Sequence, residues 1–339
     1  MFWNRIAALA EVLLILALGN LVGEALFAAT LGPVLLAESA SDLELATADG
    51  LLIFFRLGLA AAFGFTLLYL RRGITPRQAG VSLNNHSLGY LLQQGVVVGL
   101  FSSFFIALLF ATHRIVPLGE GLAAWWTYNE TPINLTFLVY FLGTSFLIPP
   151  LTEEIMTRGY FRVRMVESYG VIAGVILTGL VFGLSHTSYL NGDSMLALFM
   201  LLILINSVVW TYLAQKTGSV LPPMIAHAIG NGVGTAVLFN IWIPFLIVTI
   251  GLVLVRKSIA ALLAEILQAW KTDAERNSLW QGLLIVVLIL GAALVSLAQI
   301  GRTPTLLGLG MFCIVITLVN LVLEKKQVDG NREVLGAAD

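Results

Sequence analysis

Glu153-Glu154-Ile155-Met156-Thr157-Arg158 follows an apolar run, Phe137 to Ile148, that is broken by Pro149 and Pro150. Two adjacent carboxylates at the end of a membrane-length segment are too costly to be filler. If the residues after the prolines are helical, Glu154 and Arg158 stand four apart and can pair. Glu153 then projects about 100° away around the helix and has no local cation. Glu153 is therefore the predicted free carboxylate. The alternative is a solvated helix start, where the helix N-terminus favours negative charge.

The composition is that of a membrane protein. The chain has 339 residues, of which 58% are hydrophobic and 11% are charged. Soluble domains carry about 25% charged residues and about 45–50% apolar ones, so we expect a polytopic protein whose surroundings are a lipid bilayer. The formal net charge of −1 indicates no particular partner, and we expect no nucleic acid. The single cysteine, Cys313, excludes an intrachain disulfide and a multi-cysteine metal site.

Windows of about 20 apolar residues predict an all-α bundle of about ten transmembrane helices. The predicted spans are roughly 6–31, 51–70, 91–111, 133–148, 171–185, 195–213, 221–239, 242–255, 279–300 and 305–323. The fourth, fifth and eighth are short, which is typical of helices that begin or end inside a protein-lined cavity. The first is interpreted as a retained span rather than a signal peptide, because its apolar run continues past Gly32.

The distribution of basic residues predicts the orientation. With the N-terminus inside, 15 of the 18 lysines and arginines fall on the inner side. Arg114 and Arg302 fall outside, and Arg56 lies within a span. We therefore expect both termini in the cytoplasm and an integral protein of a bacterial inner or plasma membrane.

The predicted organisation has four parts. They are a membrane core over residues 1–257, an amphipathic cytoplasmic linker helix over 258–278, two additional spans over 279–323 and a flexible cytoplasmic tail over 324–339. The linker carries an apolar face from Ile259 to Trp270 beside Glu265 and Lys271, as in a helix that lies on a membrane surface.

Several polar residues outside the glutamate motif have structural interpretations. For Glu11, Glu24 and Arg56 we expect mutual pairing or proximity to an interface, in preference to a proton or substrate path. We expect Asn206 to make an interhelical hydrogen bond. We expect His86 and His113 to lie in solvated loops.

Two later spans each carry one histidine. The fifth ends in Phe182-Gly183-Leu184-Ser185-His186, and the seventh contains His227-Ala228-Ile229-Gly230-Asn231. A lone membrane histidine is more often a packing residue than a catalyst. His227 and Asn231, however, are four apart and share one helical face, so two polar groups point to one place. For Glu153 and His186 to meet, the break at the two prolines must put the glutamates inside the membrane.

If these groups meet, their chemistry is hydrolytic. Glu153 would be the general base on a water, and His186 would share the proton. His227 and Asn231 would donate hydrogen bonds to the oxyanion that forms when water attacks a carbonyl. Alternatively, Glu153, His186 and His227 would hold a zinc ion with a water in the fourth position.

The three motifs, Glu153-Glu154-x-x-x-Arg158, Phe182-x-x-x-His186 and His227-x-x-x-Asn231, resemble those of the CPBP family of intramembrane proteases, the CAAX proteases and bacteriocin-processing enzymes of the Abi group. The resemblance covers about residues 136–239. It implies an eight-helix core around a cavity within the membrane and hydrolysis of peptide bonds near the membrane face.

The resemblance also implies a role for each residue. Glu153 and His186 activate water, His227 and Asn231 form the oxyanion site, and Arg158 holds Glu154 in place. Phe182 belongs to the second motif. The family has been described both as zinc enzymes and as metal-free, and we favour the metal-free mechanism with no required cofactor.

The leading hypothesis is an intramembrane endopeptidase that cuts a membrane-anchored peptide or protein near its end. One alternative is a non-catalytic membrane scaffold or immunity protein of the same family. Another is a proton-coupled transporter, since glutamates and histidines in a bundle also make proton relays. The absence of inverted-repeat halves disfavours the transporter.

Overall fold

The computed structural model describes residues 2–35, 41–83, 86–116, 135–186 and 194–272, together with Trp280 and Leu283. Within these residues the chain is helical and contains no strand, which confirms the predicted all-α bundle. The helices are α1 Phe2–Thr30, α2 Gly32–Leu35, α3 Asp42–Arg72, α4 Leu88–Ile115, α6 Leu135–Val139, η2 Tyr140–Leu147, α7 Ile148–Glu154, η3 Ile155–Phe161, α8 Arg162–Tyr169, α9 Val171–Leu184, α10 Ser194–Thr217, α11 Leu221–Phe239 and α12 Trp242–Thr272, where η denotes a π-helix.

Among the residues that the structure describes, five helices are long and apolar enough to cross a membrane: α1, α3, α4, α10 and α12. The fifth predicted span is the shorter apolar helix α9, and the seventh coincides with α11, Leu221–Phe239. The ninth and tenth spans and the tail lie outside the described residues, so the count of ten helices stays a prediction.

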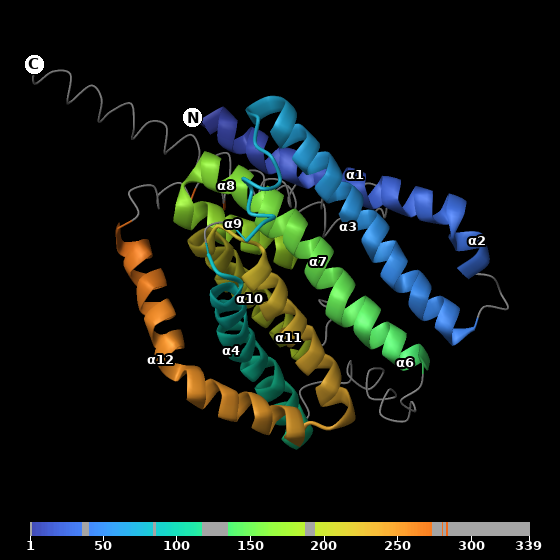
Figure 1. The fold of residues 1–339 in the computed structure, drawn as a ribbon, viewed down its shortest axis with the longest axis vertical. Helices are drawn as coiled ribbons and strands as arrows, with labels where there is room; N and C mark the ends of the chain where they lie inside the picture. The colour runs from blue at the N-terminus through green and yellow to red at the C-terminus, as the bar shows by residue number, and fades with distance from the viewer. Residues whose placement is uncertain are drawn as a thin grey trace, which may run out of the picture.

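The bundle packs in pairs around the glutamate-bearing stretch. Helix α1 packs along α3, α10 along α9, and α4 along both α11 and α12. Figure 1 shows the green stretch from α6 through α7 to α8 between the blue pair α1–α3 and the yellow helices α10 and α11. This position lets α7 and η3 contact α3, α9, α10 and α11.

The predicted inner end of the fourth span, at Ile148, is wrong. The chain does not stop being helical at Ile148 but continues through α7, η3 and α8 to Tyr169, so the two prolines do not break the helix. They occupy the first turn of α7, where a missing N–H costs little. The preceding turn is wound as a π-helix, with the Ile148 N–H donating to the Gly143 carbonyl. The glutamates therefore lie inside one long helical stretch.

The eighth span and the amphipathic stretch also form one helix. Helix α12 continues without interruption from Trp242 to Thr272, and Figure 1 shows it bent. In its second half Ile259 and Leu262 are buried, and Glu265 pairs with Lys216 of α10. Part of the predicted membrane-facing surface is therefore packed on the protein. The division into four parts is otherwise a prediction.

The polar residues of the first two spans are paired, although not all with one another. Arg56 donates to Asn20 Oδ1 at 2.7 Å and lies 3.4 Å from Glu24. Glu11 instead accepts from Arg71 at 3.0 Å and Arg164 at 3.1 Å, the latter on α8. The expected mutual pairing is therefore correct for Glu24 and Arg56 and wrong for Glu11.

Three further polar predictions have mixed outcomes. His86 is exposed in the segment before α4, as expected. His113 is not in a loop but in the last turn of α4, where it is buried, because that helix continues to Ile115. Asn206 is buried in α10, and its interhelical hydrogen bond stays a prediction.

Candidate active site

Glu153 and Glu154 end α7 and face different surroundings. The Glu154 side chain is fully buried, whereas that of Glu153 is 14% exposed. Glu154 Oε1 lies 2.9 Å from Arg158 Nη1, the four-residue pair expected from the sequence, and 2.8 Å from His227 Nδ1 of α11. One carboxylate oxygen thus joins two helices.

Arg158 is fully buried and held from several sides. Its Nη1 also donates to Thr157 Oγ1 at 2.7 Å, and its Nη2 donates to Ser207 Oγ at 2.6 Å and to the Ser207 carbonyl at 3.2 Å. The guanidinium carbon lies 4.5 Å from the centre of the Phe182 ring, an attractive cation–π arrangement. Helices α9 and α10 therefore fix the cation that neutralises Glu154.

His227 is clamped between a carboxylate and an indole. Its ring stacks on Trp210 with centroids 4.8 Å apart and planes 27° apart, and Trp210 Nε1 donates to Ser102 Oγ on α4 at 3.0 Å. A carboxylate that accepts from a guanidinium is ionised, so His227 Nδ1 is the donor to Glu154. The other ring nitrogen, Nε2, lies 3.9 Å from Glu153 Oε2.

Glu153 Oε2 is the polar atom best placed for chemistry. Like Glu154 Oε2, it is buried and makes no hydrogen bond within the described part of the chain, but it lies 3.9 Å from His227 Nε2. A buried carboxylate oxygen without a donor is unfavourable by about 1–3 kcal/mol or more. An oxygen in this state beside His227 Nε2 is suited to accept a hydrogen bond from a water or a substrate.

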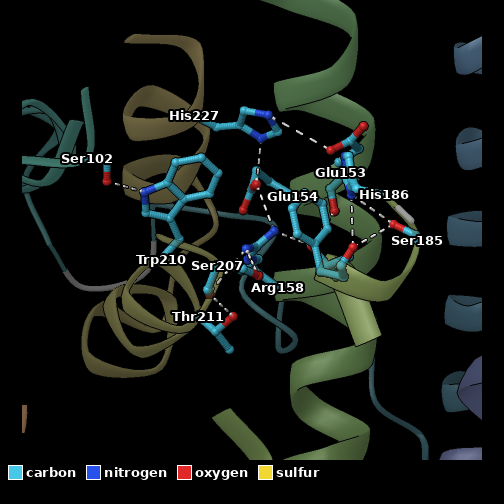
Figure 2. A network of polar contacts seen from close by, with 12 residues as sticks. Ser102, Glu153, Glu154, Arg158, Ser185, His186, Ser207, Trp210, Thr211 and His227 are labelled. Carbon is cyan, nitrogen blue, oxygen red and sulfur yellow. Dashed lines mark hydrogen bonds and ion pairs between the residues drawn. The ribbon is translucent and has the colours of Figure 1, made fainter. Parts of the chain in front are cut away.

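His186 joins the network through an aromatic ring. It lies just beyond the end of α9, with its Nδ1 3.0 Å from the Phe182 carbonyl and 3.2 Å from Ser185 Oγ. The Phe182 ring lies 4.7 Å from the His186 ring and 6.2 Å from the His227 ring. Figure 2 shows His186 and His227 in one network with both glutamates and Arg158.

Asn231 lies on the same helix as His227 but contacts a different element. Its Nδ2 donates to the Ser145 carbonyl of η2 at 2.9 Å. The structure therefore brings Glu153, Glu154 and His227 into direct contact. His186 and Asn231 are anchored around them by Phe182 and by a main-chain carbonyl.

A comparison with known protein families identifies the same part of the chain. Residues 134–233 match the family model described as Rce1-like, type II CAAX prenyl endopeptidase. The chain carries an Rce1-like segment. This match confirms the resemblance to the CPBP and CAAX protease family that the three motifs predicted. No curated protein and no solved structure gives a significant match to the chain.

The Rce1-like segment contains all the predicted site residues and begins one residue before α6. The Rce1-like segment, together with five helices of membrane-spanning length among the described residues, makes the protein an integral membrane protein. Helices α1, α3 and α4 precede the segment, and α12 follows it.

The described residues do not assemble a zinc site in the Rce1-like segment. A catalytic zinc needs three converging protein ligands, and no group of three or more His, Cys, Asp or Glu side chains in this part of the chain is arranged to hold a metal ion. The zinc set considered from the sequence, Glu153, His186 and His227, does not fit as these residues lie.

Sequence reasoning missed the residues that support the Rce1-like site from outside its motifs. Ser207 and Trp210 lie on α10, and Ser102 lies on α4. Each is a polar group inside an apolar helix, and such residues often make interhelical hydrogen bonds. That signal was available, but the sequence does not show which partner each residue has.

Proposed function

We propose that the protein is an intramembrane endopeptidase that hydrolyses a peptide bond of a membrane-associated peptide or protein near the membrane face, without a metal. The observation that carries the proposal is the buried contact of Glu153 and Glu154 with His227, with Glu154 also paired to Arg158, inside the Rce1-like segment. A structural ion pair needs only one carboxylate for one arginine. Glu153 and His227 are not needed for that ion pair, and hydrolysis would use them.

In this proposal Glu153 is the general base. A water about 2.8 Å from both Glu153 Oε2 and His227 Nε2 fits geometrically, because these atoms lie 3.9 Å apart. Glu153 takes a proton from this water as its oxygen attacks the substrate carbonyl, a role that contributes about 10²–10⁴-fold to rate. His186 shares that proton, and the leaving amine receives it when the carbon–nitrogen bond breaks.

His227 and Asn231 stabilise the oxyanion in this proposal. Glu154 holds the Nδ1–H of His227, so Nε2 is the ring atom that meets the reacting groups. When protonated, Nε2–H donates to the oxyanion. Asn231 uses one of its two amide hydrogens on the Ser145 carbonyl and keeps the other for the substrate.

The test uses purified protein in liposomes and a quenched fluorescent peptide that ends in a CAAX sequence, with and without a farnesyl group. We expect the native chain to cleave one of these peptides and Glu153→Gln to reduce the rate by about 10²–10⁴-fold. The control is Glu44→Gln, the same change at the start of α3, where glutamine can still cap the helix. Equal rates for Glu153→Gln and the native chain would overturn the role of Glu153 as general base, and a native chain that cleaves neither peptide would favour a non-catalytic scaffold.

The two peptides and a chelator resolve the finer points. Cleavage of the farnesylated peptide alone would assign prenylated substrates, and equal cleavage would assign a general membrane-anchored peptide. We expect 1,10-phenanthroline to leave the rate unchanged. Loss of activity that zinc restores would contradict the metal-free mechanism and leave the protease assignment standing.

A further inference from the structure

The Ser145 carbonyl has no main-chain partner available within its own helix. In an α-helix it would accept from the N–H of residue 149, and in a π-helix from that of residue 150. Both positions are proline, which has no N–H. Two residues earlier, the Gly143 carbonyl accepts from the Ile148 N–H, so that donor is already in use.

Asn231 of α11 supplies the missing donor. Its Nδ2 lies 2.9 Å from the Ser145 oxygen. A carbonyl oxygen can only accept, so the amide nitrogen of Asn231 must face it, and the flip state of the amide is fixed. The partly buried Asn231 side chain therefore presents its second N–H in one direction.

The same two stretches meet a second time at the catalytic contact. His227, one turn before Asn231 on α11, contacts Glu154 at the end of α7. The Ser145 contact is thus a second point of attachment between α11 and the helix that carries the glutamates. Because this contact lies next to the site, the missing N–H groups of the prolines affect a residue of the site, Asn231.

We propose that Pro149 and Pro150 are positioning residues for the oxyanion site, because together they leave the Ser145 carbonyl to orient the Asn231 amide. This inference rests on the proposed function for its effect on rate, but the contact itself can be tested without any activity. The prolines touch no reacting atom. They act through Ser145 and Asn231.

The first test is a double-mutant cycle on thermal unfolding in detergent. Asn231→Ala should lower the melting temperature of the native chain, because it leaves the Ser145 carbonyl without a donor. With Pro149→Ala and Pro150→Ala the new N–H groups satisfy that carbonyl, so adding Asn231→Ala should cost much less. Equal losses in both backgrounds would overturn the inference, whether or not the protein is a protease.

The second test is kinetic. The chain with Pro149→Ala and Pro150→Ala should be at least as stable as the native chain and yet have a lower kcat with KM unchanged. The loss should lie between about tenfold and the 10²–10³-fold typical of removing one oxyanion donor. Pro244→Ala, in the first turn of α12, is the control and should leave kcat unchanged. A purely structural role predicts that activity follows stability, and an unchanged kcat in the double variant would reject the positioning role.

A native chain that cleaves no peptide would contradict the proposed function rather than this inference. The thermal cycle would then still decide whether the prolines release the Ser145 carbonyl for Asn231. Failure of the inference and failure of the proposed function are thus separate results.

Discussion

Two glutamates that are neighbours in sequence have opposite surroundings. Glu154 is fully buried and contacts Arg158 and His227 through one oxygen, whereas Glu153 is 14% exposed and faces His227 Nε2 at 3.9 Å. Their side chains leave the helix about 100° apart, so one can be neutralised while the other stays available. At this scale, adjacent positions on one helix separate a structural carboxylate from a reactive one.

The buried pair of Glu154 and Arg158 should show strong coupling. Arg158→Met leaves a buried carboxylate without its cation and should destabilise the protein by about 3–5 kcal/mol. Adding Glu154→Gln removes that unpaired charge, so the double variant should lose clearly less than the sum of the single losses. Chemical unfolding in detergent measures all four proteins.

The control for this cycle is Lys216→Met with Glu265→Gln, since that pair is partly exposed and should contribute about 0–1 kcal/mol. Additive losses at residues 154 and 158 would show that their contact carries no coupling energy.

Sequence spacing predicted the pair of Glu154 and Arg158, but contacts between different helices could not be predicted in this way. Four-residue spacing places Glu154 beside Arg158 in any helix. The partners of Arg158 on α10 depend on which helix packs there, and so does the pairing of Glu11 with Arg164 on α8. Interactions within one helix are therefore readable from sequence, whereas the choice among several apolar neighbours is not.

At the scale of helices, α1 and α3 approach closely through two glycines spaced four apart. A Cβ added at Gly19 would lie 2.4 Å from Ala60 Cβ, and one added at Gly23 would lie 2.5 Å from the Arg56 Cα. Glycines at this spacing let two membrane helices bring their backbones together. The short distance also places Arg56 against Asn20 and Glu24 of α1.

Gly19→Ala should therefore destabilise the protein, because its methyl group would force α1 away from α3. Gly58→Ala is the matched control: it lies in the middle of α3 with no atom within 4 Å of the added Cβ. Alanine is favoured over glycine in a helix by about 1 kcal/mol, so Gly58→Ala should be neutral or stabilising. Thermal unfolding of both variants checks this, and a Gly19→Ala protein as stable as the Gly58→Ala protein would refute the close packing.

Two helix ends were predicted wrongly for physical reasons that differ. The sequence predicts a break at the two prolines, but proline fits the first turn of α7 and only removes donors there. The eighth span was ended by Arg256 and Lys257, where hydropathy falls. Arginine and lysine are good helix formers, so α12 continues past them to Thr272. Apolar windows locate membrane segments and not helix ends.

At the scale of the whole molecule, the bundle has two distinct ends. At one end an apolar cluster joins the end of α4, the start of α10, the end of α11 and the start of α12. At the other end Arg5, Arg72 and Arg164 bond to residues of α8 or α1, and Arg162 donates to the Ala79 carbonyl. Figure 1 shows the N-terminus and α8 at the end opposite α6. The positive-inside rule assigns the arginine-rich end to the cytoplasm.

This orientation can be tested by cysteine labelling in intact cells. Replacing Cys313 by serine gives a background without cysteine, since Cys313 is the single one in the chain. In this background Asp42→Cys at the start of α3 and Val116→Cys after α4 should react with a membrane-impermeant maleimide from outside. Leu83→Cys, which is exposed between α3 and α4, and Gln268→Cys, near the end of α12, should react only after permeabilisation.

Each pair in this experiment is the control for the other, because all four positions are exposed and differ only in the predicted side. Val116 and Leu83 flank the same helix, so opposite labelling of these two would establish that α4 crosses the membrane. Asp42 and Leu83 give the same test for α3. Labelling of Leu83 and Gln268 from outside would show that the bundle has the opposite orientation, with the arginine-rich end in the external medium, against the positive-inside rule. External labelling of Leu83 together with Asp42 and Val116 would instead mean that neither α3 nor α4 crosses the membrane, and the close packing of α1 on α3 would then need a different orientation in the bilayer.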